Sequence, residues 1–271
     1  MKILKRKKSS HFHLTLSKRH QFVLVTALLT MGLLFTQLLK SDSRFTIVGA
    51  LAIATYFLSA WSLREDLSGV KWLTLLVLPM MYTLGVGFSY FLLPVRWITR
   101  LPVALLYAVG LYALLLTENI YNVAAVRTIQ LLRAAHAVGF LLTLITAFLL
   151  FQTFLSFHFP FWLNFVGVFL ITLPLVLQAL WAVNLEEGIS KTVAIYSLFF
   201  SLLVAEVALA FSFWPLNLSL WVLFLVAIIY ALLGVGQQYL KGRLFRRTAI
   251  EFFLVPIFIF FILLFSGKWG G

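Results

Sequence analysis

A dense group of polar side chains occupies residues 118 to 136 of an otherwise apolar sequence. These nineteen positions hold one acid, two asparagines, one glutamine, two arginines and one histidine. Side chains of these types can hold an anionic or polar ligand through charge-assisted hydrogen bonds. Glu118, Asn122, Arg133 and His136 are therefore the candidate ligand or ion site in this segment.

The spacing of these four residues suggests how they are positioned. On one continuous helix, Asn122 and Arg133 lie within about 60° of Glu118, and His136 lies at nearly the same angle. The segment then forms an amphipathic helix on the membrane surface, with its arginines reaching toward lipid phosphates. Two alternatives remain open. The polar side can be a seam turned into the protein to bind a ligand, or it can be an interface with a partner protein.

Glu206 is the second candidate, because it interrupts the apolar run SLLVAEVALAFSF. It lies seven positions from the outer end of a predicted membrane span, which is roughly 10 Å at the helical rise per residue. A carboxyl group at that depth is expected to face the protein interior and to have a partner. Glu206 is therefore a candidate proton or cation site, or alternatively an acid that joins helices by hydrogen bonds. The candidate partners in the same outer half are Arg96, Arg100, His158 and Asn164.

The composition indicates the class of protein that must position these side chains. A soluble domain carries about 45–50% apolar and about 25% charged residues. This chain of 271 residues has 63% hydrophobic and 11% charged residues, and its mean hydropathy is +1.05. A soluble fold of this size has too little interior to cover that much apolar surface. The sequence therefore predicts an integral membrane protein.

Apolar runs of the length that crosses a bilayer, about 20 residues, recur along the whole chain. They predict an all-α polytopic helix bundle with about nine transmembrane helices and short loops. Residues 1–20 are a basic N-terminal arm, residues 21–266 a single transmembrane domain, and residues 267–271 a short tail. The predicted spans lie near residues 21–39, 45–62, 72–94, 101–117, 134–156, 161–183, 192–213, 219–238 and 252–266.

The distribution of basic residues predicts the orientation of the bundle. With the N-terminus inside, 16 of the 21 Lys and Arg residues lie on the inner side of the nine spans, as the positive-inside rule requires. We therefore expect a cytoplasmic N-terminus and a cytoplasmic (inner) membrane location. The formal charge of +13 is explained by this orientation, so nucleic acid is not an expected partner. The expected partners are the lipid bilayer, anionic headgroups at the cytoplasmic face, and a partner membrane protein.

Motifs that would identify an enzyme are missing from the sequence. It has no cysteine, no H-E-x-x-H pair and no Walker A loop. The tract LEEGISK, residues 185–191, resembles the E-E-x-x-x-R motif of CAAX-protease-like membrane metalloproteases only in Glu186 and Glu187, with Lys191 where the family has arginine. The downstream histidines of that family are lacking, because the last histidine is His158. We therefore expect no catalytic residue, no metal and no cofactor.

These observations favour a small transporter-like or channel-like protein with a polar seam between its helices. The first alternative is a non-catalytic assembly or scaffold subunit that holds a partner through residues 118–136. The second is a membrane-embedded enzyme that acts on lipid-linked substrates, with arginines clamping phosphate. The three hypotheses differ in where the polar side chains point.

Overall fold

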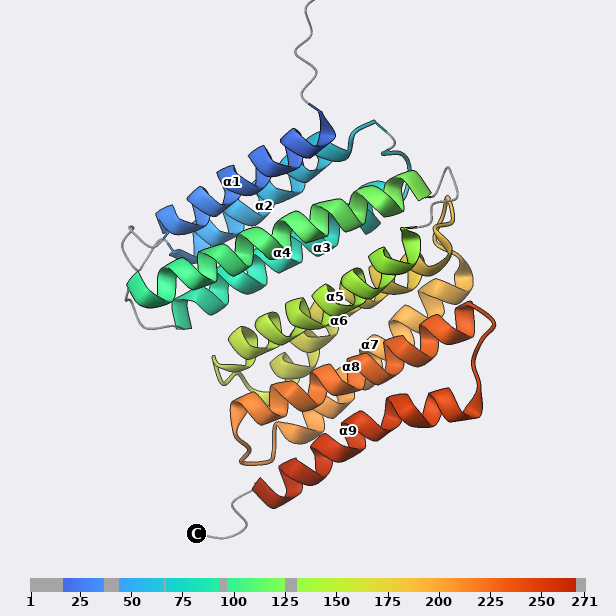
Figure 1. Ribbon diagram of the computed structural model, residues 1–271. Coiled ribbons are helices and arrows are strands. Elements are labelled where there is room, and N and C mark those ends of the chain that lie inside the picture. Colours follow the sequence, from blue (N-terminus) through green and yellow to red (C-terminus); the bar gives the residue numbers. More distant parts are fainter. Residues whose placement is uncertain (1–16, 37–43, 66, 93–96, 125–130, 267–271) are drawn as a thin grey trace, which may run out of the picture.

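The computed structural model describes residues 17–36, 44–65, 67–92, 97–124 and 131–266. These residues form nine α-helices and no strand, and all nine are long and apolar enough to span a membrane (Figure 1). The predicted all-helical polytopic bundle is thereby confirmed. The helices are α1 (Lys18–Thr36), α2 (Arg44–Leu63), α3 (Lys71–Leu92), α4 (Trp97–Ala124), α5 (Leu132–Leu155), α6 (Phe161–Asn184), α7 (Lys191–Phe211), α8 (Leu218–Leu240) and α9 (Arg246–Ser266).

The helix boundaries follow the predicted spans closely, except in α4 and α9. α4 continues seven residues past its predicted end, because the polar side chains of its last turns, Glu118 and Asn122, are buried against other helices instead of lying in water. α9 begins six residues before its predicted span. Its first turns are charged and exposed, with Arg247 and Glu251 paired at 3.4 Å, so the apolar run starts later than the helix. Residues 1–16 of the predicted arm and the tail 267–271 lie outside the described residues.

Inside the helices, hydroxyl side chains donate hydrogen bonds to backbone carbonyls of their own helix. Lipid offers no hydrogen bonds, so a spanning segment must make its own. Thr143 and Thr146 each donate a hydroxyl hydrogen bond to the carbonyl four residues earlier in α5, and Ser197 does the same in α7. Two helices also begin with a side-chain cap. The Ser190 hydroxyl accepts from the amide of Val193, and the Asn217 side chain accepts from that of Ser219.

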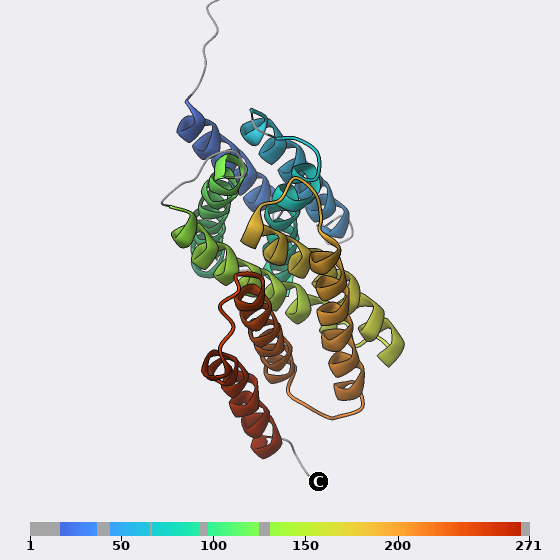
Figure 2. The same ribbon diagram turned by 90° about the vertical axis from the view of Figure 1, so that its right-hand side faces the viewer.

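The helices are arranged as two groups of four with one helix beside them (Figure 1). In the first group, α1 to α4 pack in sequence and α4 returns to contact α1. In the second group, α5 to α8 do the same, and α8 contacts α5. The groups meet where α3 and α4 contact α5 and where α3 contacts α6. α9 lies at the edge of the bundle against α8 (Figure 2).

One hydrophobic core joins the two groups. Its buried side chains come from every helix from α1 to α8, and the most voluminous of those that are fully buried is Trp181 of α6. α9 takes part only in a smaller second cluster, to which it contributes the buried residues Ile259 and Leu263. The two four-helix groups therefore form one packed body, while α9 is attached mainly through α8.

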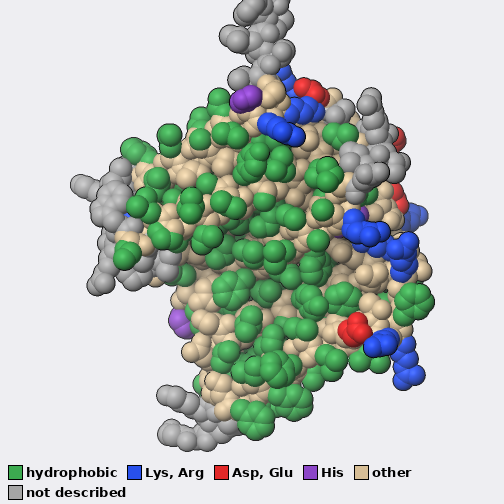
Figure 3. Space-filling model, viewed as in Figure 1, with side chains coloured by type: hydrophobic (Ala, Val, Ile, Leu, Met, Phe, Trp, Pro, Cys, Tyr) green, Lys and Arg blue, Asp and Glu red, His purple; other side chains and the backbone are tan. Residues whose placement is uncertain are grey.

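Charged residues are gathered at one end of the bundle, which we name the basic end. It is the end at which α1, α3, α5, α7 and α9 begin. The face between the two ends is covered with hydrophobic side chains (Figure 3), as a surface in contact with lipid tails must be. Ten of the twelve described Lys and Arg residues lie at the basic end: Lys18, Arg19, Arg64, Lys71, Arg133, Lys191, Lys241, Arg243, Arg246 and Arg247.

Single cysteines test this arrangement cleanly, because the chain contains none. Ser68→Cys and Gly188→Cys lie in connections at the basic end, whereas His158→Cys and Pro215→Cys lie in connections at the opposite end. In sealed vesicles, we expect a membrane-impermeant thiol reagent to label these two pairs from opposite sides. Labelling of all four positions from one side would contradict a membrane-spanning bundle.

Candidate functional site

Glu118 is buried where the two four-helix groups meet. It lies on the inward face of α4, three turns after the buried Tyr107, and its side chain is 0% exposed. Its Oε1 atom accepts a hydrogen bond of 3.0 Å from the Nε2 amide of Gln178 in α6. Its Oε2 atom has no hydrogen-bond partner among the described residues. One carboxyl oxygen is therefore satisfied across the junction and the other is not.

Asn122 lies one turn after Glu118 and fixes this end of α4 to the first helix group. Its Nδ2 amide donates to the carbonyl of Leu63 at the end of α2, at 2.9 Å. Its own carbonyl accepts from the Nζ of Lys71 at the start of α3, at 3.2 Å. The Oδ1 atom of Asn122 is buried without a hydrogen-bond partner in the described part of the chain. We name Glu118, Asn122, Gln178 and Lys71 the junction site.

Tyr121 and His136 brace the junction site from α4 and α5. The Tyr121 hydroxyl donates to the carbonyl of Ala135 at 2.9 Å, and the Tyr121 and His136 rings pack at 5.6 Å. The Nε2 of His136 lies 2.7 Å from the carbonyl of Ala182 in α6. A carbonyl only accepts, so this ring nitrogen carries the hydrogen. Gly139 permits the contact, since a Cβ at that position would lie 2.6 Å from the Tyr121 hydroxyl.

The junction site offers oxygen atoms that lack donors. Glu118 and Asn122 are four residues apart, so their side chains share one face of α4, and each has a buried oxygen with no partner among the described residues. A carboxyl oxygen can take up a proton, and carboxyl and amide oxygens are ligands of small cations. Within the described residues, no group of three or more His, Cys, Asp and Glu side chains is placed to hold a metal ion.

The expected continuous helix over residues 118–136 is wrong. Glu118 and Asn122 belong to α4, whereas Arg133 and His136 belong to the neighbouring helix α5, which starts at Leu132. The stretch between them, 125–130, lies outside the described residues. Arg133 is exposed and lines a separate cavity with His136. Glu118 and Asn122 therefore belong to the junction site and Arg133 to the separate cavity, whereas His136 contacts Tyr121 beside the junction site and also lines that cavity.

Glu206 does not face the protein interior, contrary to expectation. It is exposed on α7, five residues before the helix ends at Phe211, and makes no ion pair with a described residue. The reason is the packing of α7, which buries the neighbouring Val204 and Ala205 instead. The carboxyl group is therefore directed outward, about 8 Å from the end of its helix.

The proposed outer partners of Glu206 are engaged elsewhere or exposed. The Nδ2 amide of Asn164 donates to the hydroxyl of Ser212 at 3.0 Å. His158 is exposed in the turn before α6. Arg100 lies on α4 in the other helix group, where its carbonyl accepts from the Tyr90 hydroxyl at 3.2 Å. Arg96 lies outside the described residues.

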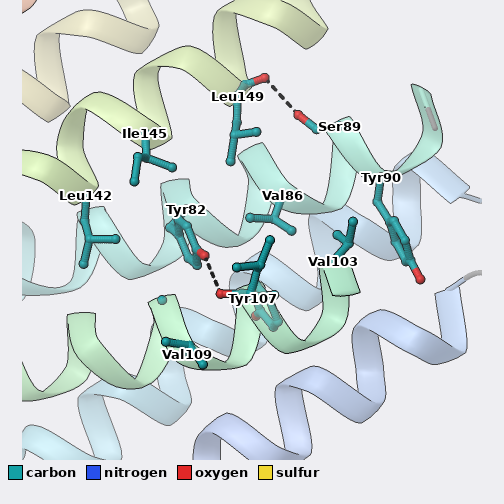
Figure 4. Close-up of a pocket in the computed structure, with 12 residues that line it drawn as sticks. Tyr82, Val86, Ser89, Tyr90, Val103, Tyr107, Val109, Leu142, Ile145 and Leu149 are labelled. Atoms are coloured by element: carbon teal, nitrogen blue, oxygen red, sulfur yellow. Dashed lines mark hydrogen bonds between the residues drawn. The ribbon is translucent and has the colours of Figure 1, made fainter. Parts of the chain in front are cut away.

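An apolar cavity of about 410 Å³ lies between α3, α4 and α5, toward the opposite end from the junction site (Figure 4). The Tyr82 hydroxyl donates to the carbonyl of Leu106 at 3.2 Å, and that of Ser89 donates to the carbonyl of Leu149 at 3.1 Å. Tyr107 shares a hydrogen bond with Thr83 at 3.0 Å. These polar groups are engaged within the protein, so the cavity offers mainly apolar contact, as an acyl chain requires.

One family model covers nearly the whole fold. It is described as "Protein of unknown function (DUF5656)", and it matches residues 23–266, from the first turns of α1 to the end of α9. The chain belongs to this family. No curated protein and no solved structure matches it. The DUF5656 description states no ligand or activity, so the junction site in this member of the family is argued from its geometry.

Sequence reasoning missed two members of the junction site. Gln178 lies within the predicted span 161–183. Its side-chain amide donates a hydrogen bond to Glu118. Lys71 directly precedes the predicted span 72–94, but it is 7% exposed and reaches the carbonyl of Asn122. The available signal was the helical spacing of Glu118 with the buried face of α4, where Tyr107, Leu111, Leu114 and Glu118 follow one another at intervals of three or four residues.

Replacing Gln178 with Leu tests the hydrogen bond across the junction. The variant removes the donor to Glu118 and leaves a buried carboxyl oxygen unsatisfied, so we expect a loss of about 1–3 kcal/mol in unfolding free energy. The measurement is thermal or denaturant unfolding in detergent. Glu118→Gln is the matched control, because its amide oxygen can still accept from Gln178. If Gln178→Leu is as stable as the wild type, the junction hydrogen bond does not stabilise the fold.

Proposed function

We propose that this protein is a small transporter-like membrane protein in which Glu118 takes up and releases a proton or a small cation. The observation that carries the proposal is the fully buried carboxyl group with one oxygen bonded to Gln178 and one oxygen without a partner among the described residues. An ionisable side chain within a membrane protein is costly to keep, and such residues mark ion and proton pathways.

The position of Glu118 suggests how binding is linked to movement. Its helix, α4, belongs to the first group of helices, and its hydrogen-bond donor is on α6 in the second. Adding a proton or cation changes the hydrogen bond between the carboxyl group and Gln178. A carboxylate only accepts hydrogen bonds, whereas a carboxylic acid also donates one. A ligand that favours one arrangement of the two groups shifts the population toward it.

Access to Glu118 is proposed from the basic end. The residue lies six positions before the end of α4, about 9 Å along the helix. Toward the opposite end, the same face of α4 carries Leu111, Leu114 and Leu115, all fully buried. This apolar layer separates Glu118 from the other side of the membrane. Release to that side therefore requires the two helix groups to move relative to each other.

We also propose that the basic end faces the cytoplasm and that the membrane is the cytoplasmic (inner) membrane. The support is the concentration of described Lys and Arg residues at one end of the helices, which is how cytoplasmic ends are marked. Glu118 then exchanges its proton or cation with the cytoplasmic side first. The N-terminus and the loops α2–α3, α6–α7 and α8–α9 lie on that side.

Ion flux into vesicles tests the proposal. The purified full chain is reconstituted, a membrane potential is imposed, and proton and sodium movement are followed with dyes trapped inside. We expect wild-type flux of one of these ions and, for Glu118→Gln, flux no greater than in protein-free vesicles, because the amide cannot exchange charge. Glu251→Gln is the matched control, since Glu251 is exposed on α9.

Two outcomes would contradict the proposal. One is wild-type flux that does not exceed that of empty vesicles for either ion. The other is equal flux in the wild type and in Glu118→Gln, with both proteins folded. Loss of flux in Glu251→Gln as well would indicate a general defect instead of a role for the buried carboxyl group.

A second candidate function, that of an assembly subunit, is favoured by Glu206. The carboxyl group shares the outward face of α7 with Ile195, Leu198 and Leu202, which are 65%, 55% and 37% exposed. A charged group facing lipid at this depth is costly, whereas a helix of a partner membrane protein can supply a hydrogen-bond donor. The α7 face is thus proposed as the contact with a partner.

Crosslinking in native membranes tests the assembly function. Ala210→Cys places a thiol one turn from Glu206 on the exposed face of α7. We expect a thiol-bound photocrosslinker there to give one discrete adduct, which disappears when Glu206 is also changed to Lys. Ile98→Cys is the control, because Ile98 is 80% exposed on α4, away from this face. Equal adducts from both cysteines, or none from Ala210→Cys, would refute a specific contact.

A further inference from the structure

A polar cavity lies at the basic end, between α5, α8 and α9. We name it the basic pocket. It has a volume of about 260 Å³, somewhat below the usual range of about 300–1,000 Å³ for small-molecule sites. This volume suits a headgroup or a small anion better than a large substrate. The polar residues that line it are Arg133 and His136 of α5, Gln237 and Gln238 of α8, and Lys241.

The basic pocket carries positive charge. Two cations, Arg133 and Lys241, line it, and none of its described lining residues is Asp or Glu. Burial lowers the pKa of the Lys241 ammonium, and the positive charge of nearby Arg243 lowers it further. A bound anion would offset this crowding of positive charge and favour the charged form of Lys241.

Amide and imidazole groups line the same pocket as the two cations. The Nε2 of Gln237 donates to the carbonyl of Ala179 at 3.2 Å, which fixes that side chain against α6. His136 is likewise held by Ala182, so it presents a fixed ring to the cavity. Gln238 lies three residues before Lys241 and lines the same cavity. The pocket is thus built on three helices whose positions are set by other contacts.

Aromatic rings line the inner part of the basic pocket. Phe140 of α5 and Phe252 of α9 line the cavity, and Tyr230 of α8 contacts both rings at 5.7 Å and 5.3 Å. Gly234 makes room for this packing, because a Cβ there would lie 2.3 Å from the Phe252 ring. The cavity therefore joins charged side chains at the basic end to apolar side chains below them, as the boundary between headgroups and tails does.

We propose that the basic pocket binds a phosphate group, carried either by an anionic lipid headgroup or by a free phosphate ion. Arg133 and Lys241 hold the phosphate oxygens by charge-assisted hydrogen bonds. Basic pockets between transmembrane helices are sites where anionic headgroups bind. This site is distinct from Glu118 and does not depend on ion transport, so either proposal can fail while the other stands.

Thermal stability of the full chain in detergent tests the site, with phosphatidylglycerol, phosphatidylcholine and inorganic phosphate as probes. We expect phosphatidylglycerol to raise the unfolding temperature more than phosphatidylcholine does. Arg133→Gln and Lys241→Gln should each weaken apparent binding by about tenfold, as for the loss of one charged hydrogen bond. Arg64→Gln is the matched control, because it removes an exposed positive charge from the same end outside the pocket.

The probes separate the two sources of phosphate. If inorganic phosphate gives the same stabilisation and competes with phosphatidylglycerol, the pocket takes a free anion. If only phosphatidylglycerol stabilises, it takes a lipid headgroup. As a measurement that needs no charge removal, Gln238→Cys should react more slowly with a thiol reagent when the effective probe is present. The proposal is overturned if neither anion exceeds phosphatidylcholine, or if Arg64→Gln weakens binding as much as the two pocket variants.

Discussion

A carboxyl group taken out of water must receive donors from its neighbours, and Glu118 receives one from Gln178 across the junction of the two helix groups. Much of the basic end is arranged around this requirement. α4 continues past the usual length of a span to bring Glu118 and Asn122 into the protein. Lys71, Tyr121 and other polar side chains then fix the end of α4 to α2, α3 and α5.

Elsewhere in the bundle, buried polar side chains also need hydrogen-bond partners, and many find them within the protein. Hydroxyl groups such as those of Thr143 and Ser197 return to the carbonyl one turn earlier in their own helix. Tyr82 and Ser89 bond to backbone carbonyls of neighbouring helices. Such groups stabilise packing and leave little for a ligand. Among the described residues, Glu118 has the one buried carboxyl oxygen with no hydrogen-bond partner. It is therefore the strongest candidate for binding a proton or a cation.

The helices could be predicted from the sequence, because lipid imposes a length and an apolar composition on every span. Pro79, Pro174 and Pro256 fall inside the predicted spans, and the helices continue through all three. The end of α4 was misjudged because composition cannot distinguish a polar turn in water from one that a partner helix covers. Gln178, sixty residues away, is that partner, and no local pattern connects it to Glu118.

The same limit explains Glu206 and the split of the four candidate residues. Hydrophobicity all round α7 predicts that it spans a membrane, but gives no preference for which side is buried. Whether Glu206 points inward depends on the packing of α6 and α8 against α7, which is a tertiary property. Glu118 and Arg133 lie on two different helices, α4 and α5, although one helical wheel puts them on one side.

The attachment of α9 has a consequence for how this fold can open. α9 packs mainly on α8 and buries only Pro256, Ile259 and Leu263. Moving it sideways exchanges contacts with α8 for contacts with lipid tails, which are about as apolar, so no hydrophobic driving force opposes the step. The seam between α8 and α9 is therefore the place where this bundle can separate within the membrane with the least loss of buried surface.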